Sequence, residues 1–303
     1  MKIAIAGGSG FVGKALAQLC LQKGYEVTVL TRRSESYPSD NDRLSYIQWL
    51  TPSSQPETSL EGIDAFINLS GESLNSGRWT KKKKQQIIDS RITATKELVR
   101  ILSSLEKKPS AVVQASAVGI YGTSKDQTFT EESQEYGSDF LAETVKAWEK
   151  EAEALNEMGI RTCLARFGVI LEKDGGALPL MALPYKLFAG GRLGSGDQWV
   201  SWVHLEDAVR SILYMIYNPK LQGPVNVTAP HPAPMAEFGK TLGTVLKRPH
   251  WFPAPSFALR PVLGEKSILI LDGQKVMPER LRQAGFTFQY PKLDLALQQI
   301  FSK

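Results

Sequence analysis

Short apolar runs and helical periodicities alternate along the first half of the chain. Residues 2–6 form an apolar run that ends at a glycine-rich turn, and from residue 11 apolar positions recur at the spacing of one helical face. Gly24 ends this predicted helix, and the apolar run at 25–30 predicts a second strand. The chain is therefore predicted to open with a strand–helix–strand unit.

Further apolar runs continue this alternation. Residues 63–71, 110–117 and 160–171 each predict a buried parallel strand. Helical periodicity predicts a helix from residue 80 to about 105 and a second helix over 138–159. Strands that alternate with helices at this spacing predict an α/β fold with a Rossmann-type, doubly wound parallel sheet.

The pattern changes after about residue 171. Residues 172–204 are rich in glycine and aromatic residues without a clear period, which predicts a loop that closes over a pocket. A helix is predicted from about 205 to 217, and residues 235–303 look mainly helical with proline breaks. We expect two parts. Residues 1–171 form a Rossmann domain, to which residues 205–228 return. Residues 172–204 and 229–303 form a smaller, mainly helical substrate-side lobe.

Three glycines at the first strand–helix junction predict a dinucleotide site. Gly7 permits a tight turn, Gly10 lets the backbone approach a pyrophosphate, and Gly13 lets the helix pack closely on the sheet. The helix start at Phe11 and Val12 supplies unpaired N–H groups. An ordinary glycine-rich turn is the alternative, but this junction is the context that the motif requires.

The end of the second predicted strand indicates which dinucleotide binds. Binders of NAD usually carry Asp or Glu there, whereas this chain has Thr31, Arg32 and Arg33. Guanidinium groups match phosphate geometry, so NADP with its 2′-phosphate is the expected cofactor. The alternative is that both arginines are solvated loop residues.

Composition and charge exclude several classes of function. Hydrophobic residues make up 42% and charged residues 22% of 303 residues, and the net charge is +5. This mild charge suits an anionic small molecule better than nucleic acid, which we do not expect as a partner. Without a run of about 18 apolar residues or a signal peptide, we expect a cytoplasmic protein with no membrane partner. A homo-oligomer is one arrangement that the sequence allows.

The few cysteines and histidines predict structural roles. Cys20 and Cys163 are expected to be buried thiols in a reducing cytosol. We expect His204 at a strand end, with Asp207 bonding backbone nearby, and a substrate contact is the alternative. A metal site is disfavoured because no second ligand lies at ligand spacing.

The sequence ASAVGIYGTSK at 115–125 contains the residue types of one large class of nicotinamide-dependent enzymes. Ser116, Tyr121 and Lys125 are the three candidates. The intervening residues 122–124 are poor helix formers, however. Without a helix, a spacing of four does not bring Tyr121 and Lys125 onto one face.

The motifs GGSGFVG, INLSG, SAVGIYG, RFGVIL and WVHLED together resemble the extended short-chain dehydrogenase/reductase superfamily, the sugar-nucleotide epimerases and dehydratases. The motifs NLSGE, DFLAE and GGRLGSGDQWVSWVHLED resemble more closely its atypical "epimerase family" subfamily, and this resemblance covers nearly the whole chain. It implies further nucleotide-binding residues: Asn68, Leu69, Ser70, Gly71 and Arg91. A solvated Arg91 is the alternative.

The resemblance also implies an active site that this chain lacks in part. The superfamily uses a Ser or Thr at the end of the fifth strand and a Tyr-x-x-x-Lys pair on the next helix. The hydroxyl position here is Ala117, with Ser116 one residue away, and Leu141 and Val145 occupy the positions of the pair. Moving the alignment by one residue recovers a lysine at 146 but no tyrosine.

The sequence leaves three functions open. The first is an NADP(H)-dependent oxidoreductase or epimerase-like enzyme for a small metabolite, with Ser116, Tyr121 or Tyr136 as the acid. The second is a non-catalytic NADP(H)-binding module that senses redox state. The third is a non-redox isomerase or hydrolase on the same scaffold.

Overall fold

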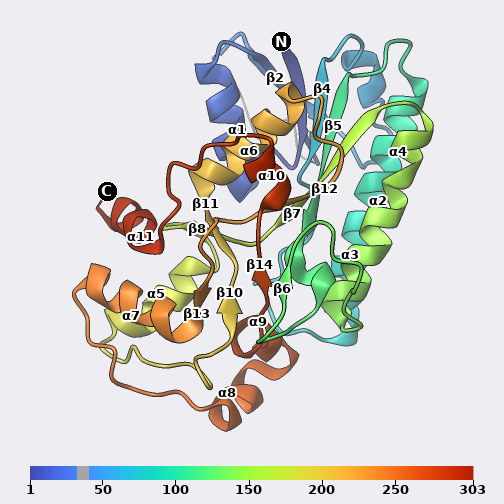
Figure 1. Cartoon of the computed structure of the whole chain (residues 1–303). Helices are drawn as coiled ribbons and strands as arrows, with labels where there is room; N and C mark the ends of the chain where they lie inside the picture. Colours follow the sequence, from blue (N-terminus) through green and yellow to red (C-terminus); the bar gives the residue numbers. More distant parts are fainter. Residues whose placement is uncertain (33–40, 303) are drawn as a thin grey trace.

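A seven-stranded parallel sheet forms the centre of the molecule (Figure 1). The computed structural model describes residues 1–32 and 41–302. The spatial order is β12-β7-β5-β4-β1-β2-β3, so the chain reverses its direction of growth between β1 and β4. The predicted Rossmann-type doubly wound sheet is therefore confirmed. Its strands are β1 Lys2–Ala6, β2 Glu26–Thr31, β3 Leu44–Gln48, β4 Ala65–Asn68, β5 Ala111–Ala117, β7 Arg161–Phe167 and β12 Gly223–Val227.

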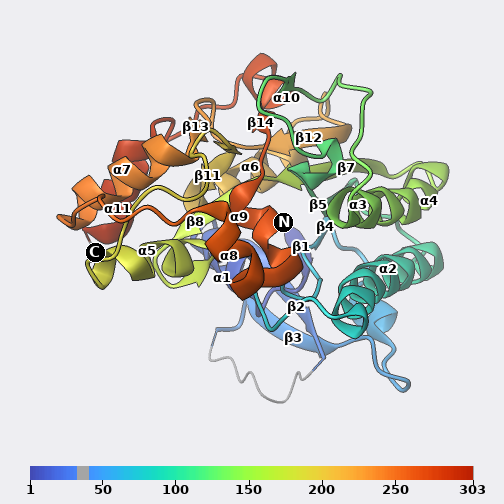
Figure 2. The ribbon, with the colours of Figure 1, turned by 90° about the horizontal axis from the view of Figure 1, so that it is seen from below.

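Helices cover both faces of this sheet (Figure 2). Because successive strand residues point to opposite faces, Ile3 and Ile5 pack in one apolar core, and Ala4 packs in the other. The first core lies under α1 Phe11–Gln22 and α6 Leu205–Tyr217, and the second under α2 Lys81–Ser104 and α4 Glu153–Glu157. Helix α3 Phe140–Glu151 packs against α2.

The helix starts follow from capping side chains. The hydroxyl of Thr80 accepts from the N–H of Lys83 at the start of α2. The carboxylate of Asp139 accepts from two N–H groups at the start of α3. The predicted helix over 138–159 is interrupted at Ala152, so it forms the two pieces α3 and α4.

The apolar run 160–171 is not one strand, and this prediction was wrong. It forms β7 in the central sheet and then β8 Val169–Glu172, which pairs with β11 Trp202–His204 and β9 Gly175–Gly176. The break falls at Gly168, where a Cβ atom would lie 2.2 Å from the carbonyl oxygen of Ser201. The crossing backbone therefore excludes a side chain at this position.

Residues 172–204 were predicted as a loop, and this was wrong in part. They contain α5 Leu178–Lys186 and short strands, among them β10 Trp199–Val200. Helix α5 packs against α7 Met235–Leu246, and α7 packs against α11 Leu293–Phe301, around a separate apolar core. The expected helical character of the C-terminal lobe is confirmed.

Shorter elements complete the chain. On the C-terminal side they are β13 Ala233–Pro234, α8 Ser256–Leu263, η4 Gly264–Ser267, α9 Ile268–Leu271, β14 Lys275–Val276 and α10 Glu279–Gln283. Elsewhere they are η2 Pro56–Ser59, η3 Val118–Tyr121 and β6 Thr128–Phe129, which pairs with β14. Within the described ranges, no helix combines the length and the apolar composition that crossing a membrane requires.

The cysteines and His204 have structural surroundings. Both thiols are free and buried, and burial raises the pKa of Cys20 to about 12 and of Cys163 to about 11. The Nδ1 atom of His204 accepts from the N–H of Glu206 and caps α6. Asp207 accepts from the backbone N–H groups of residues 289 and 290, as expected for a residue that binds backbone.

Candidate cofactor site and the adjoining polar network

Apart from Arg91 on α2, the described residues predicted to bind the cofactor gather at one edge of the sheet. They follow the carboxyl ends of β1, β2 and β4, and β1 lies between the other two strands. In open α/β sheets, ligands bind at this edge, where the direction of strand order reverses. The fold therefore assembles three chain segments that lie up to about 60 residues apart.

The glycine turn after β1 has no room for side chains at two positions. Gly7 has a φ of +77°, and a Cβ atom there would lie 2.9 Å from the backbone of Leu69. A Cβ atom at Gly13 would lie 2.2 Å from the carbonyl oxygen of Gly7. Gly10 is the N-cap of α1 and has no side-chain cap, so the first N–H groups of the helix remain available to an anion.

The next residues of α1 connect this turn to the β8–β9 hairpin. The ring of Phe11 lies against Gly175 and Gly176, where a Cβ atom at Gly175 would approach it within 2.3 Å. Val12 is half-buried and packs on the core beneath α1. Phe11 therefore has a packing role in addition to its position at the helix start.

The segment from Asn68 to Gly71 forms the neighbouring wall. The Asn68 amide donates to Gln114 Oε1 at 3.0 Å and accepts from the N–H of Ser70 at 3.1 Å. These bonds fix the turn after β4 and hold the backbone of Leu69 against Gly7. The Gly71 backbone in turn lies close to the guanidinium of Arg91.

Arg91 is half-buried beneath this wall, with its guanidinium bonded to backbone. Its Nη1 atom donates to the carbonyl oxygens of Ile87 at 2.8 Å and Glu72 at 3.2 Å, and its guanidinium lies 5.1 Å from the Trp148 ring centroid. Burial lowers the pKa of Arg91 to about 10, so the side chain is still charged at neutral pH. It supports the turn at Gly71 with a positive charge.

The end of β2 carries the residues predicted to select the cofactor. Thr31 is buried, whereas Arg32 is exposed. The charge of Arg32 helps to lower the pKa of Glu72, although the first cause of that shift is the hydrogen bond from Lys83. Arg33 lies outside the described residues.

A buried ion pair lies at the ends of β5 and β7, beside the cofactor edge. Arg166 is 1% exposed, and its Nε and Nη2 atoms donate to the two carboxylate oxygens of Glu149, both at 2.8 Å. Burial alone would lower the pKa of Arg166, but the hydrogen bonds and charge of Glu149 raise it. The hydroxyl of Ser116 donates to Glu149 Oε1 at 2.5 Å.

The same guanidinium also engages Tyr121. Its Nη1 atom donates to the Tyr121 hydroxyl at 2.9 Å, and that hydroxyl donates to Asn226 Oδ1 at 2.8 Å. Burial raises the pKa of Tyr121, and the Arg166 charge opposes this shift only in part. Both sequence-predicted hydroxyls, Ser116 and Tyr121, are therefore held in one internal network.

Tyr136 is the more open hydroxyl of this region. The residue is 43% exposed, and its hydroxyl lies 3.5 Å from Arg166 Nη2. The Arg166 guanidinium also lies 5.5 Å from its ring centroid. Tyr136 is thus the candidate acid that combines a neighbouring cation with access to solvent.

Helix α3 presents apolar residues where the superfamily's tyrosine and lysine are expected. Leu141 packs against Gly119, and Val145 is buried beside Tyr121. Lys125 lies on an exposed loop, where its Nζ atom is 3.4 Å from the Ser195 hydroxyl and 3.8 Å from Asp197 Oδ2. Tyr121 and Lys125 therefore do not share a helical face.

Sequence reasoning did not assign Glu149, Arg166 or Asn226 to this site. A signal was present at Arg166, because a charged residue interrupts the apolar run TCLARFGVIL. A buried charge of this kind needs a partner, but the sequence does not say which of 31 carboxylates provides it.

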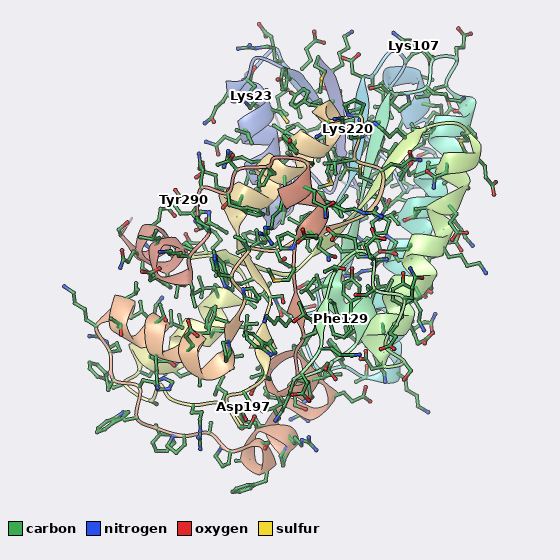
Figure 3. All side chains as sticks on the ribbon, in the orientation of Figure 1. Lys23, Lys107, Phe129, Asp197, Lys220 and Tyr290 are labelled. Atoms are coloured by element: carbon green, nitrogen blue, oxygen red, sulfur yellow. The ribbon has the colours of Figure 1, made fainter. Side chains whose placement is uncertain are left out.

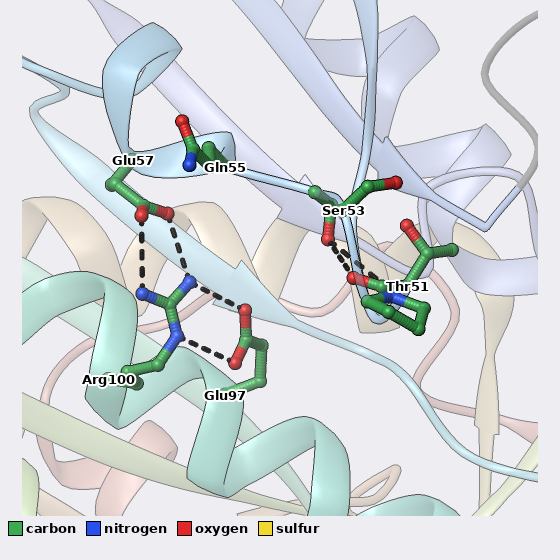
Figure 4. Close-up of a pocket in the computed structure, with 8 residues that line it drawn as sticks. Thr51, Ser53, Gln55, Glu57, Glu97 and Arg100 are labelled. Carbon is green, nitrogen blue, oxygen red and sulfur yellow. Dashed lines mark hydrogen bonds and ion pairs between the residues drawn. The ribbon is translucent and has the colours of Figure 1, made fainter.

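An open hollow lies elsewhere, between the segment 51–57 and α2 (Figure 4). Its volume is about 370 Å³, and Arg100 bridges Glu57 and Glu97 across it. None of the predicted site residues lines it. Across residues 1–32 and 41–302, no group of three or more His, Cys, Asp or Glu side chains could hold a metal ion.

Two family models together match most of the chain. A model of the NAD dependent epimerase/dehydratase family matches residues 3–228, and a domain of unknown function (DUF1731) matches residues 254–300. The chain belongs to the NAD dependent epimerase/dehydratase family. Within it, the resemblance to the atypical extended "epimerase family" proteins is confirmed.

Relatives cover the chain from end to end. Epimerase family protein YfhF of Bacillus subtilis is 48% identical over 302 residues, which cover 100% of this chain and 98% of that protein. The structure of human epimerase family protein SDR39U1 (isoform 2) with NADPH has a TM-score of 0.89 and 32% identity, with 100% of both chains covered. A nucleoside-diphosphate sugar epimerase from Corynebacterium glutamicum has a TM-score of 0.78 and 29% identity, covering 100% of this chain and 59% of that one.

Proposed function

We propose that the chain binds NADP(H) at the carboxyl ends of β1, β2 and β4 and acts on a small metabolite as an oxidoreductase or epimerase-like enzyme. The observation that carries the cofactor choice is the end of β2. Arg32 is exposed there beside the glycine turn, and the last residues of the strand include no carboxylate. The human relative solved with NADPH supports the same choice.

Each part of the dinucleotide has a candidate partner in this site. The uncapped N–H groups of α1 at Gly10 suit the pyrophosphate. Arg32 suits the 2′-phosphate, because a guanidinium donates forked, charge-assisted hydrogen bonds to phosphate oxygens. Arg91 adds a half-buried positive charge beneath Gly71, which would attract either dinucleotide.

The cofactor proposal is tested by replacing Arg32. A charge-assisted bond contributes roughly 1.5–3 kcal/mol. Arg32→Ala should therefore weaken NADPH binding roughly ten- to a hundredfold and leave NADH binding nearly unchanged. Fluorescence titration with both nucleotides measures this. Arg43→Ala is the matched control, because Arg43 is also exposed but precedes β3 at the opposite edge of the sheet.

Equal wild-type affinities for NADPH and NADH would contradict the cofactor choice. A similar loss of affinity for NADPH and NADH in Arg32→Ala would also contradict it, because Arg32 would then contact a part of the dinucleotide that both cofactors share.

For the reaction, we propose Tyr136 as the proton donor. Ser116 and Tyr121 already use their hydroxyl hydrogens within the buried network, whereas Tyr136 reaches solvent beside Arg166. NADPH oxidation should be followed with small aldehydes, ketones and sugar nucleotides. Tyr136→Phe should abolish any turnover and leave NADPH affinity within about twofold of wild type.

A non-catalytic NADP(H)-binding module is the second candidate. It is favoured by the apolar residues Leu141 and Val145 on α3 and by the engaged hydroxyls of Ser116 and Tyr121. Tight NADPH binding without oxidation by any of these substrates would support this candidate over the first.

A further inference from the structure

Exposed apolar side chains are concentrated on one part of the C-terminal lobe. Among the described residues, twelve large hydrophobic side chains are exposed, and eight of them lie within 180–188 and 251–262. We call these eight the apolar patch: three leucines of 180–187, Val262, and the aromatic residues Phe188, Trp251, Phe252 and Phe257. Phe257 is 79% and Trp251 is 71% exposed, so these are not partly covered core residues.

The two segments lie side by side where residues 188–194 meet residues 251–254. The indole N–H of Trp251 donates to the carbonyl oxygen of Phe188 at 2.9 Å. Backbone hydrogen bonds also join Ala254 to Arg192 at 2.8 Å and Gly194 to Ala254 at 2.9 Å. Figures 1 and 2 show α8 beneath the carboxyl edge of the sheet and α5 in the same lobe. The patch is therefore built by tertiary contacts between segments about 60 residues apart.

Within residues 1–32 and 41–302, the chain does not cover this surface. Residues 251–271, which contain α8, η4 and α9, include no buried residue. On α5, Tyr185 and Ala182 point into the core with α7, which leaves Leu180 and Leu183 on the outer side. Exposed apolar side chains gathered on neighbouring segments in this way indicate a surface that meets an apolar partner.

The segments that form the patch are rich in basic residues. Residues 180–192 and 247–266 contain six Lys and Arg residues and one acidic residue, Glu265. This difference of five equals the net charge of the whole chain, so the remaining residues are balanced. The carboxylate of Glu265 is paired with Lys84 at 2.6 Å, which reduces its effect on the local field. The segments that carry the patch therefore hold a local excess of five positive charges.

This combination favours an anionic partner over a second copy of the chain, because two copies would bring like charges together. Exposed Trp, Phe and Leu side chains bordered by Lys and Arg are the composition of surfaces that lie in a membrane interface. We propose that the apolar patch binds peripherally to a bilayer rich in anionic phospholipid. The apolar side chains enter the boundary between headgroups and acyl chains, and the basic side chains contact the headgroups.

This inference is independent of the proposed function. The sequence-based expectation of no membrane partner rested on the absence of a spanning segment, and peripheral binding needs none.

The proposal is tested by sedimentation of the full chain with vesicles. We expect binding to vesicles of equal parts phosphatidylglycerol and phosphatidylcholine, little binding to phosphatidylcholine alone, and weaker binding as salt is raised. Trp251→Ser with Phe257→Ser should reduce the affinity for anionic vesicles by at least about tenfold. The control pair Tyr217→Ser with Leu295→Ser removes similarly exposed residues outside the patch and should change the affinity less than twofold.

A second pair of variants tests the charge. Lys247→Gln with Arg248→Gln should weaken binding by about tenfold or more, since each basic residue near an anionic surface contributes about 1 kcal/mol. The control pair Lys107→Gln with Lys220→Gln removes the same amount of positive charge and should not weaken binding to the vesicles. Lys107 and Lys220 lie at the opposite end of the molecule from Asp197 and α8 (Figure 3). Thermal unfolding of each variant verifies that the fold is retained.

Three results would overturn the proposal. The first is no sedimentation with anionic vesicles, and the second is binding that the patch variants leave unchanged. The third is a wild-type dimer in solution that Trp251→Ser with Phe257→Ser dissociates, because a second copy would then cover the patch.

Discussion

Glu131 is a buried carboxyl whose two oxygen atoms have different surroundings. Its Oε1 atom accepts from the backbone N–H of Asn226 at 2.9 Å and of Arg280 at 3.3 Å. Its Oε2 atom is buried and has no hydrogen-bond partner in the described part of the chain. Burial is the first cause that raises the pKa of Glu131, and the backbone hydrogen bonds oppose it. The folded protein therefore favours the protonated carboxyl more than the unfolded chain does.

This shift predicts a pH dependence of stability. A raised folded-state pKa contributes stability below the ordinary value of 4.5, and that contribution is lost as pH rises through the folded-state pKa. The wild-type free energy of unfolding should therefore fall over this range relative to Glu131→Gln, which cannot ionise. Denaturant unfolding at a series of pH values measures the difference between the two curves.

Glu132→Gln is the matched control for this experiment. Glu132 is the next residue, is 76% exposed and pairs with Arg280 at the surface. The free energy of unfolding of Glu132→Gln, followed over the same pH values, should run parallel to that of the wild type. A Glu131→Gln curve that also runs parallel would mean that Glu131 ionises in the folded state as it does in the unfolded chain.

Helix α3 has two kinds of glutamate, and they are expected to differ in their effect on stability. Glu149 faces inward and pairs with the buried Arg166, whereas Glu143 is 59% exposed and pairs with Lys146 on the same helix. Removing one partner of a buried pair leaves the other charge without compensation, but an exposed pair contributes little.

Glu149→Gln should therefore destabilise the fold by about 3–5 kcal/mol. Glu143→Gln, the same change on the same helix, should cost less than about 0.5 kcal/mol. Denaturant unfolding monitored by tryptophan fluorescence gives both values. Equal effects would indicate that Arg166 finds other partners, such as Tyr121 and Tyr136, when Glu149 loses its charge.

At the scale of the whole molecule, α8, η4 and α9 are attached to the Rossmann side by few bonds. Lys84 pairs with Glu265, and the Nζ atom of Lys266 donates to the carbonyl oxygens of Asn75 and Gly77, both at 2.9 Å. No residue of these three elements is buried. Elements with few buried apolar contacts open at low free energy.

Amide hydrogen exchange should therefore differ within the C-terminal lobe. We expect the amides of 256–271 to exchange at least about tenfold faster than those in the middle of α7 and α11, which pack around a common core. Exchange measured by mass spectrometry on proteolytic fragments resolves these segments. Equal protection would mean that this region is held by interactions beyond those described.

The amino-acid sequence by itself determined five of the seven strands of the sheet, the helices on its faces and the glycine turn, whereas β3 and β12 were not predicted. These features depend on local patterns: strands buried on both faces are continuous apolar runs, and helices carry their own periodicity and caps. The helix predicted at 205–217 has the observed bounds of α6. The glycines at 7, 10 and 13 could be recognised because their roles depend on a strand–helix junction within a few residues.

The tertiary structure decided what distant residues do to one another. The run 160–171 is divided at Gly168 because the backbone of Ser201 crosses there, which no local pattern reveals. Ser116 and Tyr121 looked like free hydroxyls, but Glu149, Arg166 and Asn226 arrive from α3, β7 and β12 to bind them. The apolar patch likewise joins segments that are separate in sequence. Burial, pairing and exposure depend on which segments meet, and only the folded chain brings them together.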